Sequence, residues 1–311
     1  MVAAMTVAVS ARQQPAPFRS GVEIVYLDLT VTAPDGSIVT GLTQGDFAIF
    51  DEGVRHEIAV FSDQPAPISL GILVDASNSM AGERISAAIA AADAMGRALR
   101  PQDLWSVFAF NTSLFPLVGW RPFDPSVVRA LTTIQVGGGT ELFKSVADMV
   151  PKFRETSYRK RAMLIITDGA DNVVQYGRAN RRGAWVGGDP GMPGSIVDHT
   201  DKAVTALRSG EVLAYGLGIG WAQKAGGNSD LHVPSLQKLA EPTGGAVAVA
   251  RTAADLEILA KRLTDELRQQ YTVGFTPLKA PDGKYRRVKV AARNPAYAVR
   301  TRAGYLAAQK K

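Results

Sequence analysis

The chain contains 311 residues, of which 46% are hydrophobic and 21% charged, a composition typical of globular proteins and unlike that of disordered chains or fibres. It has no cysteine, which excludes disulfides, thiolate metal ligands and cysteine nucleophiles. The formal net charge of +6 is unevenly distributed, because residues 268–311 are strongly basic and the rest of the chain is slightly acidic.

Residues 1–17 resemble the apolar part of a secretory signal followed by a disordered lead. The segment Met1–Ala11 is apolar, and Val9 and Ala11 suit the −3 and −1 positions of a cleavage site, although the usual basic start is missing. We therefore expect a secreted, periplasmic or envelope-associated protein, with a short disordered terminus as the alternative. No apolar stretch of about 18 residues follows, so the sequence predicts no transmembrane segment.

Two segments at opposite ends of the chain alternate apolar and polar residues, as half-buried strands do. In residues 18–66, Val25, Leu27, Leu29 and Val31 share one face, and in residues 266–311 alternation runs through 271–275, 288–290 and 297–301. Neither segment can bury a face alone, so we predict that they pair in one small antiparallel β unit.

Between them, residues 67–265 alternate buried strands with helices. Apolar runs at 68–74, 104–110, 162–167, 212–217 and 246–250, and an edge strand at 115–120, are separated by helical patterns at 85–99, 125–133, 141–153, 198–208, 234–240 and 253–270. This order predicts an α/β fold, with a doubly wound, mostly parallel sheet and helices on both faces.

Polar side chains follow three of these predicted elements at the edge where ligands usually bind. Asp75, Ser77 and Ser79 follow the strand 68–74, and Asp168 follows the strand 162–167. Thr140 comes after three glycines and before a helix. Because loops at the carboxyl ends of parallel strands share one crevice, we expect all five side chains to converge there.

The motif Asp75-x-Ser77-x-Ser79, followed by Thr140 and then Thr167-Asp168-Gly169, resembles the metal-ion-dependent adhesion site of von Willebrand factor A (VWA) domains. The flanking segments resemble a bacterial, acidobacterial-type family of VWFA-related domain proteins, whose members mostly carry secretion signals. That resemblance is carried by Leu42-Thr43, Asp46-Phe47, Phe61, and Gln270-Tyr271 to Gly304-Tyr305. The resemblance implies a Rossmann-like VWA fold and a binding function that uses a metal ion.

The residues themselves point to a hard divalent cation, because all five side chains offer oxygen. Mg²⁺ fits this donor set best, with Mn²⁺ or Ca²⁺ possible. The resemblance implies that Ser77, Ser79 and Thr140 coordinate directly, while Asp75 and Asp168 often act through water. An ion held mainly by neutral hydroxyls stays electrophilic and can recruit a carboxylate from a protein or peptide ligand.

A structural alternative assigns the same residues to helix capping and loop support. Ser79 and Thr140 stand where N-caps are expected, and Asp75 could bind loop amides. Asn78 occupies a position that is usually Gly in the motif, and we expect the loop to survive because Asn tolerates left-handed backbone geometry. Glu141 could compensate a helix dipole, and Asp171 and Asn172 could support the metal loop or simply form a turn.

Two further features could contact a partner. The Gly-rich segment 175–195 and the loop 221–233 should overhang the metal edge. In the basic tail, Arg287, Lys289, Arg300 and Arg302 fall on polar strand faces, so we expect a solvated surface, with an anionic partner as the alternative. Aromatic interleaving is absent, so we expect no nucleic-acid partner.

The function predicted is a non-enzymatic, metal-dependent protein-binding or adhesion module. No nucleophile–base pair or phosphate loop is readable, so no catalytic residue and no organic cofactor are predicted, and a metal-dependent hydrolase is a minor alternative. A structural or assembly component of the cell envelope is the main alternative. A cytoplasmic subunit that works with an AAA-type ATPase, as among bacterial relatives of this domain, is disfavoured by the signal-like start. The sequence leaves the oligomeric state open.

Overall fold

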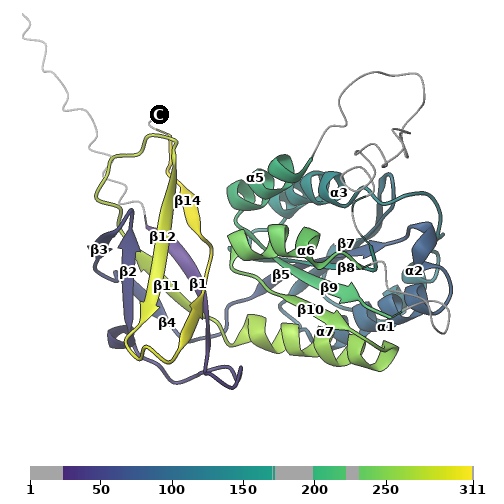
Figure 1. The fold of residues 1–311 in the computed structure, drawn as a ribbon, viewed down its shortest axis with the longest axis horizontal. Coiled ribbons are helices and arrows are strands. Elements are labelled where there is room, and N and C mark those ends of the chain that lie inside the picture. Colours follow the sequence, from purple (N-terminus) through teal and green to yellow (C-terminus); the bar gives the residue numbers. More distant parts are fainter. Residues whose placement is uncertain (1–23, 170, 172–198, 222–230, 310–311) are drawn as a thin grey trace, which may run out of the picture.

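The computed structural model describes residues 24–169, 171, 199–221 and 231–309. These residues form an α/β domain and a β-sandwich that lie side by side (Figure 1). The predicted signal-like segment 1–17, the segment 175–195 and most of the loop 221–233 lie outside the described residues. None of the helices in the described part combines the length and apolar character needed to cross a membrane.

A mixed sheet in the strand order β10-β9-β8-β5-β6-β7 forms the centre of the α/β domain. Its strands, in chain order, are β5 (Ile68–Asp75), β6 (Leu104–Phe110), β7 (Leu114–Arg121), β8 (Lys160–Thr167), β9 (Val212–Ile219) and β10 (Val247–Ala250). Neighbours pair in parallel except β7, which pairs antiparallel with β6. Every residue of β5 and β9 is buried, which explains their continuous apolar sequences.

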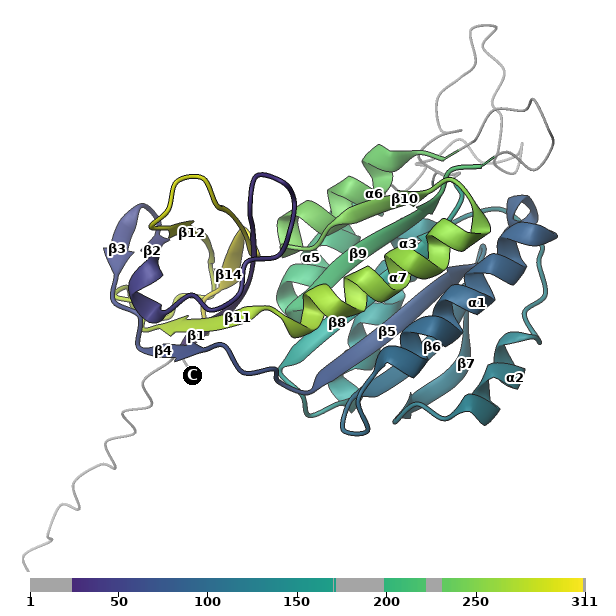
Figure 2. The same ribbon diagram turned by 90° about the horizontal axis from the view of Figure 1, so that it is seen from below.

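Helices cover both faces of this sheet (Figure 2). One apolar core contains residues of α1 (Glu83–Ala98), α2 (Val128–Leu131) and α7 (Ala253–Arg268), and a second contains residues of α3 (Leu142–Met149), α5 (Thr200–Gly210) and α6 (Val233–Ala240). The predicted helix 141–153 is α-helical only to Met149 and continues as a 3-10 helix, Val150–Glu155. Pro151, which has no N–H to donate, accounts for this change. The predicted α/β fold class is confirmed.

The two ends of the chain build the β-sandwich together. One sheet has the order β13-β1-β11-β4 and the other the order β14-β12-β2-β3. The strands are β1 (Val25–Thr32), β2 (Phe47–Asp51), β3 (Val54–His56), β4 (Val60–Ser62), β11 (Tyr271–Phe275), β12 (Tyr285–Ala292), β13 (Ala298–Arg300) and β14 (Gly304–Leu306). β1 pairs antiparallel with β11, so that Leu27 lies opposite Val273, and the apolar faces of both sheets form a third core. The predicted antiparallel unit is therefore present.

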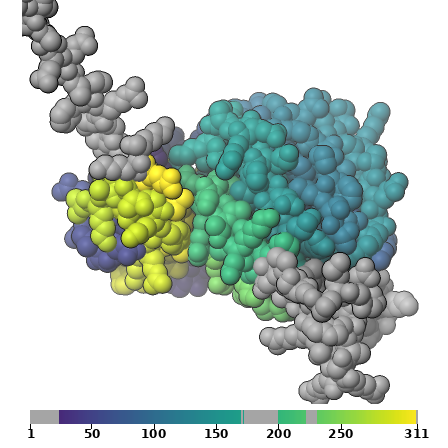
Figure 3. Space-filling model, turned by 90° about the horizontal axis from the view of Figure 1, so that it is seen from above, coloured from purple at the N-terminus to yellow at the C-terminus, as the bar shows by residue number. Residues whose placement is uncertain are grey.

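The polar face of β1 faces the α/β domain instead of solvent. Asp28 accepts two hydrogen bonds from Arg159, at 2.9 and 3.2 Å, and Arg159 lies directly before β8. Thr30 is buried and donates to Glu266 of α7. The space-filling view shows the sandwich and the α/β domain in contact with each other (Figure 3). The alternation in β1 therefore separates a sandwich core from a polar junction between the two units.

The basic tail is solvated in part only, and this corrects the expectation for two of the four basic residues that were expected on a solvated surface. Arg287 and Lys289 are exposed on β12, as expected. Arg300, however, donates to Glu266 and to the Gly244 carbonyl, and Arg302 donates to Glu211 at 2.5 Å and to the Tyr26 carbonyl at 2.8 Å. Long basic side chains on a strand can reach acids on a neighbouring unit, and their sequence does not show which acids these are.

Glu266 is the centre of this junction, because its Oε1 accepts hydrogen bonds from Thr30, Tyr215 and Arg300. We expect Glu266→Ala to lower the free energy of unfolding by about 2–4 kcal/mol, since the buried donors lose their acceptor. Urea unfolding monitored by circular dichroism measures this loss. Glu257→Ala, at an exposed position of the same helix, is the control and should change stability by less than about 0.5 kcal/mol. Equal losses in both variants would contradict the assigned role.

Candidate functional site

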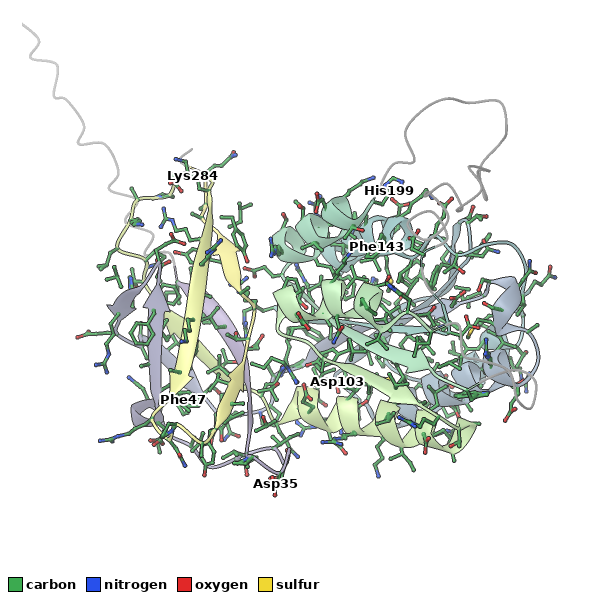
Figure 4. The ribbon with its side chains drawn as sticks, in the orientation of Figure 1. Asp35, Phe47, Asp103, Phe143, His199 and Lys284 are labelled. Carbon is green, nitrogen blue, oxygen red and sulfur yellow. The ribbon has the colours of Figure 1, made fainter. Side chains whose placement is uncertain are left out.

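The carboxyl edge of the central sheet carries the predicted site residues. β5 ends at Asp75 and β8 ends at Thr167, and the two strands pair in parallel, with Val74 opposite Ile166. Asp75 and Asp168 therefore emerge at the same edge. This edge is remote from the β-sandwich, because the sandwich contacts the amino ends of the strands. Asp103, which directly precedes β6, lies on the side that faces the sandwich (Figure 4).

Asp75 is fully buried and held by two hydrogen bonds. Its Oδ1 accepts from the Ser77 N–H at 2.8 Å, and its Oδ2 accepts from the Thr167 hydroxyl at 2.5 Å. Burial raises the pKa of the Asp75 carboxyl to about 6, the nearby Asp168 charge adds to this rise, and the hydrogen bonds oppose it. The carboxylate is thus an unfavourable buried charge, whose position is fixed by hydrogen bonds from β8 and from the loop after β5.

Ser77, Ser79 and Asp168 form a chain of oxygen atoms next to Asp75. The Ser77 and Ser79 hydroxyl oxygens are 3.0 Å apart, and the Ser79 hydroxyl donates to Asp168 Oδ1 at 2.8 Å. Ser77 and Asp168 are buried, whereas Ser79 is half-buried. The two serines and Asp168 therefore lie within one small polar cluster at the sheet edge.

Thr140 lies in a loop that is hydrogen-bonded to the serine loop. The Gly137 N–H donates to the Ala76 carbonyl at 2.8 Å, and the Asn78 N–H donates to the Gly138 carbonyl at 3.1 Å. On the other side, the Thr140 hydroxyl oxygen lies 4.0 Å from the position that a Cβ on Gly169 would take. The structure therefore places Thr140 between the loops that carry Ser77 and Asp168, and it brings all five predicted side chains to one place.

The helix-capping alternative does not describe Ser79 and Thr140. The residue that caps α1 is Gly82, and the residue that caps α3 is Glu141. Ser77 precedes the short 3-10 helix η2 (Asn78–Met80), but its side chain makes no capping hydrogen bond. The loop with Asn78 in place of Gly is intact, as expected, but Asn78 lies inside η2 and does not need the left-handed backbone geometry that was the reason for that expectation.

Two neighbouring acids support the loops. Asp171 is buried, and its Oδ2 accepts from the Phe143 N–H at 2.9 Å, so it binds the first turn of α3 and ties the Asp168 loop to the Thr140 loop. Glu141 lies 3.8 Å from Lys144 and compensates the amino end of the same helix. Asn172 lies outside the described residues.

Sequence reasoning missed Arg84, the second residue of α1. Its side chain is only 3% exposed, and its guanidinium pairs with Asp168 Oδ2. It also donates to the Ser79 carbonyl at 3.2 Å and to the Trp221 carbonyl at 2.5 Å. A signal was available, because a cation in the first turn of a helix opposes the helix dipole and therefore needs an anionic partner.

The donor set fits a hard divalent cation. In an octahedral Mg²⁺ site with ligands at about 2.1 Å, adjacent ligand oxygens are about 3 Å apart. The separations of 3.0 and 2.8 Å along Ser77, Ser79 and Asp168 match this spacing. Among the described residues no group of three or more His, Cys, Asp or Glu side chains is placed to hold a metal, so hydroxyls must contribute to any such site here.

The raised pKa of Asp75 predicts a specific dependence of stability on pH. Between about pH 4 and pH 6 the folded state binds more protons than the unfolded state, so this group makes the protein less stable as pH rises, and its cost is complete above about pH 6. The rise of the Asp75 pKa from 3.8 to about 6 corresponds to about 3 kcal/mol. We expect Asp75→Asn to stabilise the metal-free protein at pH 7.5 by about 1–3 kcal/mol and to have little effect at pH 4. Urea unfolding in EDTA at both pH values checks this, and a loss of stability at pH 7.5 would contradict it.

Comparisons with known proteins find similarity to von Willebrand factor A proteins. The family model "VWA domain containing CoxE-like protein" matches residues 52–179. The structure of a von Willebrand factor type A protein from Catenulispora acidiphila is similar over 94% of this chain and 76% of that one, with 13% identity and a TM-score of 0.52. No curated protein sequence matches significantly.

A second solved structure is similar over about two thirds of the chain. It is the vWF domain of the type V pili tip protein Mfa5 from Porphyromonas gingivalis, which covers 65% of this chain and 97% of its own, with 14% identity and a TM-score of 0.50. At 13–14% sequence identity, the similarity to these solved structures shows the fold alone. Together with the family model over residues 52–179, they show that the α/β domain has the fold of VWA domains.

Proposed function

We propose that this protein is a metal-dependent protein-binding module, in which Asp75, Ser77, Ser79, Thr140 and Asp168 hold a Mg²⁺-type ion that captures a carboxylate of a partner. The observation that carries this proposal is the oxygen chain of Ser77, Ser79 and Asp168, with separations of 3.0 and 2.8 Å. Capping does not account for the positions of the Ser79 and Thr140 hydroxyls.

The chemistry of the cluster favours binding over catalysis. The bound ion would supply an electrophilic centre for an acidic side chain of the partner. The protein's own groups fix the geometry around it, since Thr167 and the Ser77 amide orient Asp75 and Ser79 orients Asp168. VWA-type domains are generally interaction modules, which agrees with this role. Mn²⁺ and Ca²⁺ would use the same oxygen ligands.

We also propose that the protein acts outside the cytoplasm or at the cell envelope. The support is the signal-like character of residues 1–17 and the similarity of the fold to the vWF domain of a pilus tip protein. In that location the natural ligand would be a protein or peptide that presents an Asp or Glu side chain. A structural envelope component that does not depend on metal is the alternative that the following experiment tests.

Thr140→Val tests the metal site with little change of side-chain shape, because valine has nearly the volume of threonine and carries a methyl group in place of the hydroxyl. We expect the affinity for Mg²⁺ and Mn²⁺, measured by isothermal titration calorimetry, to fall about tenfold or more, which corresponds to the loss of about 1.4 kcal/mol or more of binding free energy. The free energy of unfolding without metal should change by less than about 1.5 kcal/mol.

Thr112→Val is the matched control, since Thr112 is exposed on the neighbouring loop, with its hydroxyl oxygen 3.8 Å from the Cβ position of Gly138. This variant should bind metal like the natural chain. Capture of envelope proteins should require Mg²⁺ and stop in EDTA. Capture that is unchanged in EDTA would favour the structural alternative, and metal-dependent turnover of phosphoester or peptide substrates would favour a hydrolase.

A further inference from the structure

Arg84 binds three loops at the carboxyl edge of the sheet at once. Its guanidinium contacts Ser79 after β5, Asp168 after β8 and Trp221 after β9. The side chain is 3% exposed and the Asp168 side chain is fully buried, so this ion pair is shielded from water. The Arg84 Nε has no hydrogen-bond partner among the described residues, which shows that the guanidinium is not fully satisfied there.

The charges of the cluster explain why this contact matters for a cation. The charged groups of the cluster are the carboxylates of Asp75 and Asp168 and the guanidinium of Arg84. Both oxygens of Asp168 are already used, Oδ1 by Ser79 and Oδ2 by Arg84. An incoming divalent ion therefore meets a carboxylate whose charge is already balanced by the protein.

We propose that Arg84 is a built-in counter-cation of the site, which stabilises Asp168 when no divalent ion is bound and lowers the affinity for such an ion by competing for the same carboxylate. Arg84 is a positioning residue that acts through Asp168. This role rests on the metal site proposed above. It also gives the metal-free site a defined structure, because a buried Asp168 without a counter-charge would be strongly unfavourable.

The test compares Arg84→Gln with Arg84→Lys in the full chain by calorimetric titration with Mn²⁺ and Mg²⁺ at pH 7.5 and constant ionic strength. Removing the positive charge should tighten metal binding by about tenfold or more, whereas lysine, which keeps the charge, should bind within about threefold of the natural chain. Arg97→Gln is the control, because Arg97 lies on the same helix, is 56% exposed and forms an ion pair with Asp93, away from the cluster. It should leave the affinity unchanged.

Thermal unfolding provides the second readout. Without metal, Arg84→Gln should melt at a lower temperature than the natural chain, and saturating Mg²⁺ should raise its melting temperature more than it raises that of the natural chain. If Arg84→Gln folds only when metal is present, that result also supports competition. Equal or weaker metal binding by a folded Arg84→Gln variant would overturn the proposal.

The outcomes separate this role from the proposed function. If the natural chain binds metal and Arg84→Gln binds no more tightly, only the role of Arg84 is wrong. If the natural chain binds no divalent ion at millimolar concentration but Arg84→Gln does, Arg84 replaces the ion in this protein and the metal-dependent function is wrong. If neither binds, both proposals are overturned.

Discussion

The parallel pairing of β5 with β8 is the constraint on which the site depends. It places Asp75 and Asp168 at one edge of a buried sheet, although they are far apart in the sequence. Thr167 completes this arrangement, because its hydroxyl crosses from β8 to Asp75. The two buried carboxylates repel each other and lose their hydration. The surrounding residues must therefore supply hydrogen-bond donors and positive charge. The serine hydroxyls, the loop amides and Arg84 provide them.

A second set of partly buried charges joins the two units at the opposite end of the sheet. Arg159 binds Asp28, and Arg300 binds Glu266, so the strands from both chain termini are fixed to the α/β domain by directional contacts. Apolar packing supplies the separate cores, whereas these ion pairs fix how the units meet. The carboxyl edge is left on the far side, where a partner can approach it without meeting the sandwich.

Much of the fold can be predicted from the sequence, because the spacing of apolar residues along the chain indicates which faces of each element are buried. The apolar run 68–74 is typical of a strand covered on both faces, and the alternation at Val25 to Val31 is typical of a strand with one apolar face. The site residues were also predictable as a group, since Asp75 and Asp168 each follow such a strand. The alternation did not predict which surface covers the polar face of β1. A repeat of two residues separates the two faces of a strand, but it does not show what packs against each face.

The sequence by itself determined the layers of the α/β domain, the pairing of the two terminal β segments and the edge at which the polar cluster gathers. Only the tertiary structure decided the partners of the long charged side chains. Arg84, Arg300 and Arg302 each reach an acid that is distant in the chain, and a flexible arginine side chain carries no local pattern that names its partner. The balance of charge at the site was decided in the same way, since it depends on distances across the fold and not on residue order.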